Sequence, residues 1–273
     1  MFELEIRQSR SRTAFGMLEL IYHATVREIR KDHRNPLIGL LINMMQSIIF
    51  VLTFYLLFVF LGMRGAAIRG DFLLYIMSGI FLFLCHTKAM SAVVGSEGPA
   101  SPMMQHAPMN TAIAISAAAL SSLYLQTLSL VFVLFMYHVI VTPVVIENMV
   151  GAYGMVLVAW ISGVGVGMMF LALKPWAPDV ARIGANIYSR ANMIASGKMF
   201  VANSLPSSML VLFDWNPLFH AIDQARGFIF LHYNPHFSSW TYPLYVSAGL
   251  VMLGLMAEFY TRKRASISWN AGR

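Results

Sequence analysis

Charged residues are scarce in this chain: Asp, Glu, Lys and Arg make up only 11% of its 273 residues. A water-soluble domain carries roughly a quarter charged residues. There is therefore too little charge here to cover a soluble surface. Hydrophobic residues make up 58% of the chain, and its mean hydropathy is +0.65. The composition excludes an ordinary soluble domain and favours a membrane protein.

Cysteine and the common catalytic motifs are also nearly absent. Cys85 is the only cysteine, so no internal disulfide can form and a thiolate metal cluster is excluded. The chain has no G-x-x-x-x-G-K-[ST], H-E-x-x-H or G-x-S-x-G motif. His232 and His236 lie four residues apart, but Pro235 breaks the helix that would align them. We therefore expect no enzyme activity, no cofactor and no metal site in this chain.

Long apolar stretches dominate the sequence after residue 35. A membrane-spanning helix needs about 20 mostly apolar residues. Five stretches meet this requirement: Leu37–Leu61, Phe72–Val94, Thr111–Val141, Val150–Leu173 and Tyr242–Tyr260. A sixth, about Ile183–Leu205, is interrupted by polar side chains. The sequence thus predicts an all-α membrane protein with six transmembrane helices.

The distribution of basic residues predicts the orientation of these helices. With six spans and both termini inside, thirteen Lys and Arg residues lie on the cytoplasmic side, against three in the external loops. An excess of basic residues in cytoplasmic segments is the rule for membrane proteins. Basic residues that flank spans interact with anionic lipid headgroups, which accounts for the net charge of +7. No nucleic-acid partner is therefore expected. We expect a bacterial inner-membrane protein with both termini in the cytoplasm.

The first 34 residues are polar and basic, and residues 13–33 have the pattern of an amphipathic helix. Phe15, Leu18, Tyr22, Val26 and Ile29 recur at intervals of three and four residues. Such a helix should lie in the cytoplasmic interface. It is either a passive anchor or a docking surface for another subunit. The predicted organisation is residues 1–34 as this N-terminal segment, 35–261 as the membrane domain and 262–273 as a basic tail.

Two loops stand out. Residues 95–110 contain three prolines and two glycines but no basic residue, which indicates either contact with a partner protein or an ordinary turn-rich connection. Residues 206–240 form a long external connection with apolar pieces too short to span, such as Met209–Phe213. Pieces of that length are typical of re-entrant or interfacial helices. We expect this loop to enter the outer leaflet and to cap a pathway.

Charged residues inside spans usually face a cavity, because they are costly in hydrocarbon. Arg190 and Lys198 are eight residues apart, which is about 80° around an α-helix, so both can line one side of the fifth span. Asn186 and Asn192 would extend this polar strip toward a hydroxylated or anionic cargo. The alternative is that Arg190 and Lys198 reach the two membrane surfaces.

Aromatic side chains in or near the spans offer a second kind of cargo contact. Tyr75, Trp160 and Tyr188 can stack against the apolar faces of sugar rings, or they can serve ordinary packing and interfacial roles. Gly163, Gly165 and Gly167 have spacings that let membrane helices approach closely.

The stretch from Trp215-Asn216-Pro217 through His220 to Arg226, preceded by Leu205-Pro206, resembles a segment found before the last span in one family of exporters. The entry Arg27-Glu28-Ile29-Arg30 followed by Pro36-Leu37 is similar as well. The chain thus resembles the permease subunit of type-2 ABC exporters, in the branch that exports capsular polysaccharide and O-antigen.

The resemblance implies a homodimer that works with two copies of a separate ATP-hydrolysing subunit and moves a polysaccharide or lipid-linked glycan, with periplasmic and outer-membrane export components as further partners. It assigns contact with the ATPase to Arg27, Arg30, Glu97, Pro99 and Met103. It assigns the external re-entrant cap to Trp215, Asn216, Pro217, His220 and Arg226. Two alternatives stay open: export of a small lipid or drug by the same fold, and an intramembrane transferase that uses His220 and Asp223.

Overall fold

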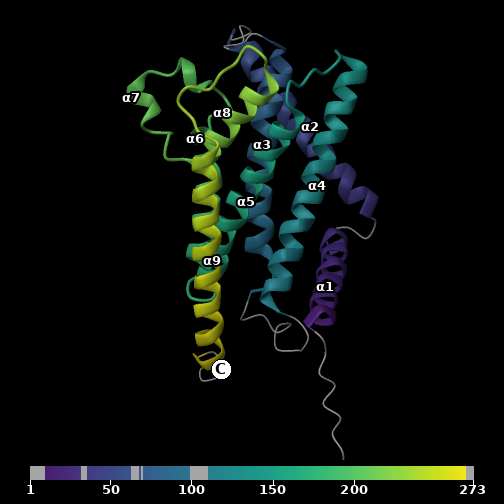
Figure 1. The fold of residues 1–273 in the computed structure, drawn as a ribbon, viewed down its shortest axis with the longest axis vertical. Helices are drawn as coiled ribbons and strands as arrows, with labels where there is room; N and C mark the ends of the chain where they lie inside the picture. The colour runs from purple at the N-terminus through teal and green to yellow at the C-terminus, as the bar shows by residue number, and fades with distance from the viewer. Residues whose placement is uncertain (1–9, 32–35, 63–67, 69, 99–109, 269–273) are drawn as a thin grey trace, which may run out of the picture.

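The computed structural model describes residues 10–31, 36–62, 68, 70–98 and 110–268. Within these ranges the chain forms helices and no strand (Figure 1). The elements are α1 (Arg10–Lys31), α2 (Pro36–Phe60), α3 (Phe72–Gly95), α4 (Thr111–Ile140), α5 (Met149–Leu173), α6 (Pro178–Ala195), η2 (Ala202–Ser204), α7 (Ser207–Leu210), α8 (Pro217–Ile229) and α9 (Thr241–Ser268).

Asp and Asn side chains fix the start of four helices. Asp71 caps α3 by accepting hydrogen bonds from Leu73 and Leu74, and Asn110, Asn148 and Asn216 cap α4, α5 and α8 in the same way. A side-chain oxygen at this position satisfies backbone N–H groups that the first helical turn leaves without partners. The long apolar helices therefore begin at defined residues.

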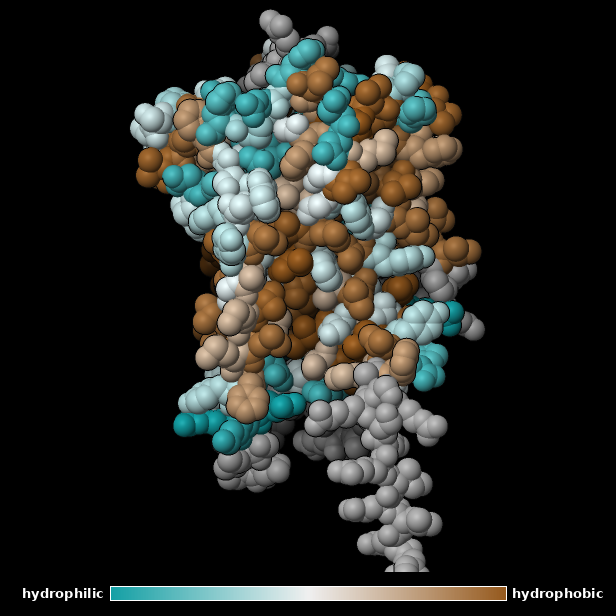
Figure 2. Space-filling view, viewed as in Figure 1, coloured by the Kyte–Doolittle hydropathy of each residue, from teal (hydrophilic) through white to brown (hydrophobic). Residues whose placement is uncertain are grey.

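Five helices in the described part of the chain are long and apolar enough to cross a membrane: α2, α3, α4, α5 and α9. They match the five apolar stretches that the sequence predicts. The most apolar part of α3 is 78% buried, whereas that of α9 is only 17% buried. Figure 2 shows the exposed apolar side chains as a belt between two more polar ends of the molecule. The protein is a multi-pass membrane protein, with α3 at its centre and apolar outer helices.

The sixth predicted span is wrong as a single helix over residues 183–205. The helix α6 ends at Ala195, because Gly197 adopts a left-handed φ of +74° that turns the chain away from the helix axis. Beyond this turn lie η2, α7 and irregular backbone. The helix α6 is also not apolar enough to be included among the five candidate spans.

The two ends of α6 nevertheless lie at different levels of the bundle, with its start near the ends of α3 and α9 and its end beside the interior of α3, where a Cβ at Gly79 would lie 2.9 Å from Lys198. Before its start, Lys174 donates to the carbonyl of Val94 near the end of α3, and Trp176 donates to Thr261 in the last part of α9. At its other end, the carbonyl of Ala195 accepts a hydrogen bond from Asn216, the cap of α8. Its 18 residues have a length of about 27 Å.

The amphipathic N-terminal helix is present but begins earlier than expected. It spans Arg10–Lys31, so Thr13 lies inside the helix rather than at its cap. Its main neighbour is the lower half of α4 in Figure 1. Phe15, Leu18 and Tyr22 are exposed, so the apolar stripe of this helix faces outward in its first part.

The glycines of α5 allow two helices to approach it, as the sequence predicts. A Cβ at Gly163 would lie 2.2 Å from the carbonyl oxygen of His86 in α3, and one at Gly167 would lie 2.8 Å from that of Met90. On the other side, a Cβ at Gly165 would meet Leu250 of α9 at 2.8 Å. The close packing of α3, α5 and α9 therefore depends on glycine at these three positions, because a larger side chain would push the helices apart.

We expect Gly163→Ala to lower the free energy of unfolding by about 2 kcal/mol or more, because the added methyl group must push backbone apart. Gly154→Ala in the same helix is the matched control, since nothing lies within 4 Å of its added Cβ. The apparent Tm of the purified protein in detergent measures both effects. Equal Tm values for the two variants would contradict the close α3–α5 contact.

Candidate functional site

A polar stripe runs along the outer face of α6. Arg182, Asn186 and Arg190 follow one another at four-residue intervals, and all three are exposed. Exposed isoleucines at positions 183, 187 and 194 flank them. Asn186 and Arg190 therefore share one face of a helix, as the sequence predicts. An exposed guanidinium partway along such a helix requires water or another protein beside it.

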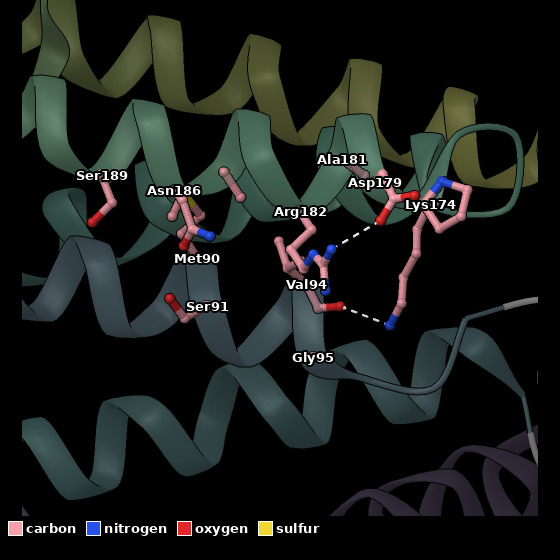
Figure 3. Close-up of a pocket in the computed structure, with 12 residues that line it drawn as sticks. Met90, Ser91, Val94, Gly95, Lys174, Asp179, Ala181, Arg182, Asn186 and Ser189 are labelled. Carbon is pink, nitrogen blue, oxygen red and sulfur yellow. Dashed lines mark hydrogen bonds and ion pairs between the residues drawn. The ribbon is translucent and has the colours of Figure 1, made fainter.

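The lower part of this stripe opens into a cavity between α3 and α6 (Figure 3). The cavity has a volume of about 440 Å³. Figure 3 shows Lys174, Asp179 and Arg182 gathered at one end, with Asn186 and Ser189 toward the other. Lys174 donates to the Val94 carbonyl at 3.2 Å, and Arg182 forms an exposed ion pair with Asp179 at 2.9 Å.

This lining has two cations, one carboxylate, an amide and hydroxyl groups. Such a set can bind an anionic or hydroxylated group through hydrogen bonds without transferring any atom to it. Groups of three or more His, Cys, Asp and Glu that could hold a metal are absent from the described ranges. The cavity lining is thus suited to binding a polar group through hydrogen bonds and charge.

Lys198 does not line the outer face of α6, which corrects the prediction from its spacing to Arg190. It lies beyond the end of the helix and is only 2% exposed. Its Nζ lies 3.6 Å from the ring centroid of Phe83 and 4.5 and 4.8 Å from those of Phe54 and Phe50. No hydrogen-bond partner for this Nζ is found within the part of the chain that the structure describes. The ring faces favour the ammonium form of Lys198 at this buried position.

Arg226 holds the turn that follows α6. Its Nη1 donates to the carbonyls of Gly197 at 3.0 Å and Phe200 at 2.6 Å, and its Nη2 donates to that of Lys198 at 2.8 Å. Its guanidinium carbon lies 4.3 Å from the ring centroid of Tyr75. Arg226 is only 1% exposed and Tyr75 is 4% exposed, so both residues belong to the core. The predicted roles of Tyr75 in a pathway and of Arg226 in the external re-entrant cap stay predictions, and in this chain both side chains serve packing and backbone hydrogen bonding.

Asn192 and Asn216 form a buried pair. The amide of Asn216 donates to the side-chain oxygen of Asn192 at 2.8 Å and to the Ala195 carbonyl at 3.0 Å, while its own oxygen caps α8. Asn192 is 4% exposed and Asn216 is 2% exposed. This side chain ties α6 to α8 and does not belong to the exposed stripe, and its role in a pathway stays a prediction.

Trp160 and Tyr188 also serve packing between helices. The indole N–H of Trp160 donates to the Ala119 carbonyl of α4 at 2.9 Å. The hydroxyl of Tyr188 lies 3.1 Å from Nε2 of His86, whose Nδ1 lies 2.8 Å from Ser162. Sugar-stacking roles for these two aromatic residues are not supported by their positions. His86 is a connection that the sequence reasoning missed, although a histidine inside an apolar run was a visible signal.

The remaining cap residues surround the start of α8. Trp215 is exposed and Pro217 is buried at the first turn of α8. His220 is buried, donating from Nε2 to the Asp214 carbonyl at 2.6 Å and accepting at Nδ1 from the Ser239 N–H at 3.1 Å.

The carboxylate of Asp223 forms its hydrogen bonds with other residues than His220. It accepts hydrogen bonds from Tyr233 and Ser238. Burial and this carboxylate raise the pKa of Tyr233. His220 and Asp223 therefore have separate partners and do not form the acid–base pair that a transferase would need.

Asp71, which the sequence reasoning also missed, joins the start of α3 to the end of α4. Tyr137 and Thr142 both donate hydrogen bonds to its carboxylate. Burial alone would raise the pKa of Asp71, but the hydrogen bonds from Tyr137, Thr142 and the backbone outweigh it and lower the pKa below its usual value. This pairing could not be read from the sequence, because 66 residues separate Asp71 from Tyr137.

The residues expected to contact an ATPase are partly described. Arg27 and Arg30 are exposed on α1, and Glu97 is half-buried just after α3. Pro99 and Met103 lie outside the described residues.

In comparisons with known proteins, no family model and no curated protein matches this chain.

The position of the Lys198 ammonium among the rings of Phe50, Phe54 and Phe83 leads to a prediction about stability. We expect Lys198→Met to keep the apparent Tm within about 3 °C of the parent, because a thioether packs well on aromatic rings and removes a buried charge. We expect Lys198→Glu to lose about 3 kcal/mol or more, since a carboxylate would face three rings without a cation. Thermal unfolding in detergent measures both, with Arg190→Glu as the exposed control. Equal Tm values for Lys198→Glu and Arg190→Glu would contradict the burial of Lys198 among the three aromatic rings.

Proposed function

We propose that this chain is the transmembrane permease subunit of an ATP-driven exporter of the type-2 ABC class, which moves a polysaccharide or lipid-linked glycan across the bacterial inner membrane. The observation that carries the proposal is the exposed polar stripe of α6, with Arg190 partway between the two ends of the bundle. Hydrocarbon is a costly environment for this stripe, whereas a hydrated lumen and a hydroxylated cargo suit it.

A second copy of the chain would enclose this lumen. One α6 per copy would place two polar stripes against water, while the apolar outer surfaces of α2, α4 and α9 remain in lipid. In this arrangement α6 is the sixth crossing, and α7 and α8 form an external, re-entrant cap. The N-terminal segment and the basic tail are then both cytoplasmic.

The positions of the cations support this orientation. Arg27, Arg30, Lys174 and Arg182 are exposed at or near the end of the bundle where α9 reaches Arg262–Arg264. Away from this end, the described cations Lys198 and Arg226 are buried in the core. Positive charge gathered at one end of a membrane protein is typical of its cytoplasmic side. Two copies of a separate ATPase would dock there, against α1 and the segment that contains Glu97.

Cargo of a different class is the main alternative, and the same fold could export a small lipid or drug. The polar lining of the α3–α6 cavity, with its amide, hydroxyl and cationic groups, favours the hydroxylated or anionic cargo. An intramembrane transferase is disfavoured by the separate hydrogen-bond partners of His220 and Asp223.

The sixth crossing can be tested by cysteine labelling, because the native Cys85 is buried and should label weakly. We expect Ser207→Cys and Val145→Cys to react with a membrane-impermeant maleimide from the same side of the membrane, and Lys174→Cys only from the opposite side. All three positions are exposed. If positions 174 and 207 label from the same side, α6 does not cross and the proposed lumen is lost.

The export function can be tested in the source organism. Deletion of the gene should cause a glycan to accumulate inside the cell, and the parent gene should restore its surface display. We expect Arg190→Lys to restore display nearly fully and Arg190→Glu to reduce it about tenfold or more, since reversing a charge in a lumen repels acidic cargo. Quantified surface glycan and membrane levels of each variant are the measurements. Equal display by the two variants, at equal protein levels, would remove Arg190 from the pathway.

A further inference from the structure

A second polar cavity lies between α1 and the helices α2, α3 and α4, with a volume of about 400 Å³. Its lining includes Asn43 and Gln46 from α2, Lys88 from α3, and Ser122 and Gln126 from α4. These are amide, hydroxyl and ammonium groups contributed by three of the apolar spans. Such a concentration of polar side chains within apolar helices is costly unless the groups bind one another or a ligand.

Hydrogen bonds between the helices satisfy part of this lining. Gln126 Nε2 donates to Asn43 Oδ1 at 3.2 Å, and Asn43 Nδ2 donates to Ser129 Oγ at 2.8 Å. Lys88 donates to Gln46 Oε1 at 2.9 Å. Gln126 Oε1, however, is buried without a hydrogen-bond partner among the described residues, and Gln126 is only 4% exposed. The cavity lining therefore includes a residue, Gln126, whose acceptor calls for a donor, together with the Lys88 ammonium.

The position of the cavity indicates where the ligand comes from. It is flanked by α1, whose Glu28 and Lys31 also line it and whose outer apolar residues Phe15 and Leu18 are exposed. An amphipathic helix with exposed apolar and basic residues lies at the level of lipid headgroups. The lower parts of α2 and α4 beside it present the exposed apolar residues Leu41 and Leu120, against which acyl chains can lie.

We propose that this cavity binds the headgroup of an anionic, hydroxyl-bearing phospholipid, of which phosphatidylglycerol is the simplest. The lipid phosphate pairs with the ammonium of Lys88, and a glycerol hydroxyl donates to Gln126 Oε1. This role is a lipid site of the permease itself, distinct from the α3–α6 cavity, and it does not depend on which cargo the protein exports. Recognition requires a phosphate and a hydroxyl donor together, so phosphatidylcholine, which has no hydroxyl donor in its headgroup, fits poorly.

The test uses the purified full chain in detergent, with phosphatidylglycerol, phosphatidylcholine or soluble glycerol phosphate added at equal concentrations. We expect phosphatidylglycerol to raise the apparent Tm by several degrees and phosphatidylcholine to have a much smaller effect. Lys88→Met and Gln126→Leu should each weaken phosphatidylglycerol binding about tenfold, which is the usual effect of removing one hydrogen bond to a charged or buried group. Lys174→Met is the matched control, because it removes a cation from the α3–α6 cavity.

Native mass spectrometry gives a second readout that does not depend on stability. The parent protein and Lys174→Met should retain one more phosphatidylglycerol than Lys88→Met does. Equal retention and equal stabilisation in all four proteins would overturn the proposal. Stabilisation by glycerol phosphate without acyl chains would overturn the lipid as the source and identify a soluble phosphate ligand instead. A sharp test thus remains even if Gln126→Leu folds poorly.

Discussion

The hydrogen bonds from Arg226 to the backbone of residues 197–200 are the interaction on which the upper half of this structure depends. The left-handed turn at Gly197 ends α6 inside the protein and leaves carbonyl groups without helical partners. In a low-dielectric interior an unpaired carbonyl is costly, and one planar guanidinium satisfies three of them. The short helices and loops above this turn can pack only because Arg226 donates hydrogen bonds to the carbonyl groups of the turn. A membrane protein tolerates non-helical backbone at depth when protein covers it in this way.

The same turn brings two buried cations, Lys198 and Arg226, close together in space, although they are 28 residues apart in the sequence and play different roles. Arg226 has hydrogen-bond acceptors, whereas among the described residues the Lys198 ammonium contacts the faces of three phenylalanine rings and no acceptor. Ring faces carry partial negative charge and can hold a cation without any hydrogen bond. Lys198 thereby joins the turn to α2 and α3, which bring Phe50, Phe54 and Phe83 together. The residue that looked most like part of a pathway is a packing element of the core.

The sequence was sufficient for the five apolar helices but not for the region between residues 178 and 240. Long apolar runs such as Thr111–Val141 predict their helix within a residue or two, because length and hydropathy decide the outcome. Around Ser196 and Gly197 the outcome depends on a turn that is stabilised from Arg226, 29 residues further along the chain. Spacing along an assumed helix therefore misplaced Lys198. Asn192 lies within α6, but on the face that contacts the start of α8. Asn186 and Arg190 were placed correctly because they lie before the turn, where the helical spacing holds.

With Lys198 and Asn192 turned inward, the exposed polarity of α6 is concentrated in Arg182, Asn186 and Arg190. The helix α6 therefore has two different sides. Its inner side packs on α3 and α5, whereas its outer side is too polar to face lipid or to pack against an apolar surface. The other outer helices present apolar side chains and need only lipid. The difference between α6 and these helices is therefore a difference in the surroundings that their outer surfaces suit: the outer side of α6 suits water or a polar surface, and the others suit lipid. The α3–α6 cavity continues this polar surface toward the end of the bundle where the basic residues gather, so a polar group entering there would meet hydrogen-bonding side chains along the helix.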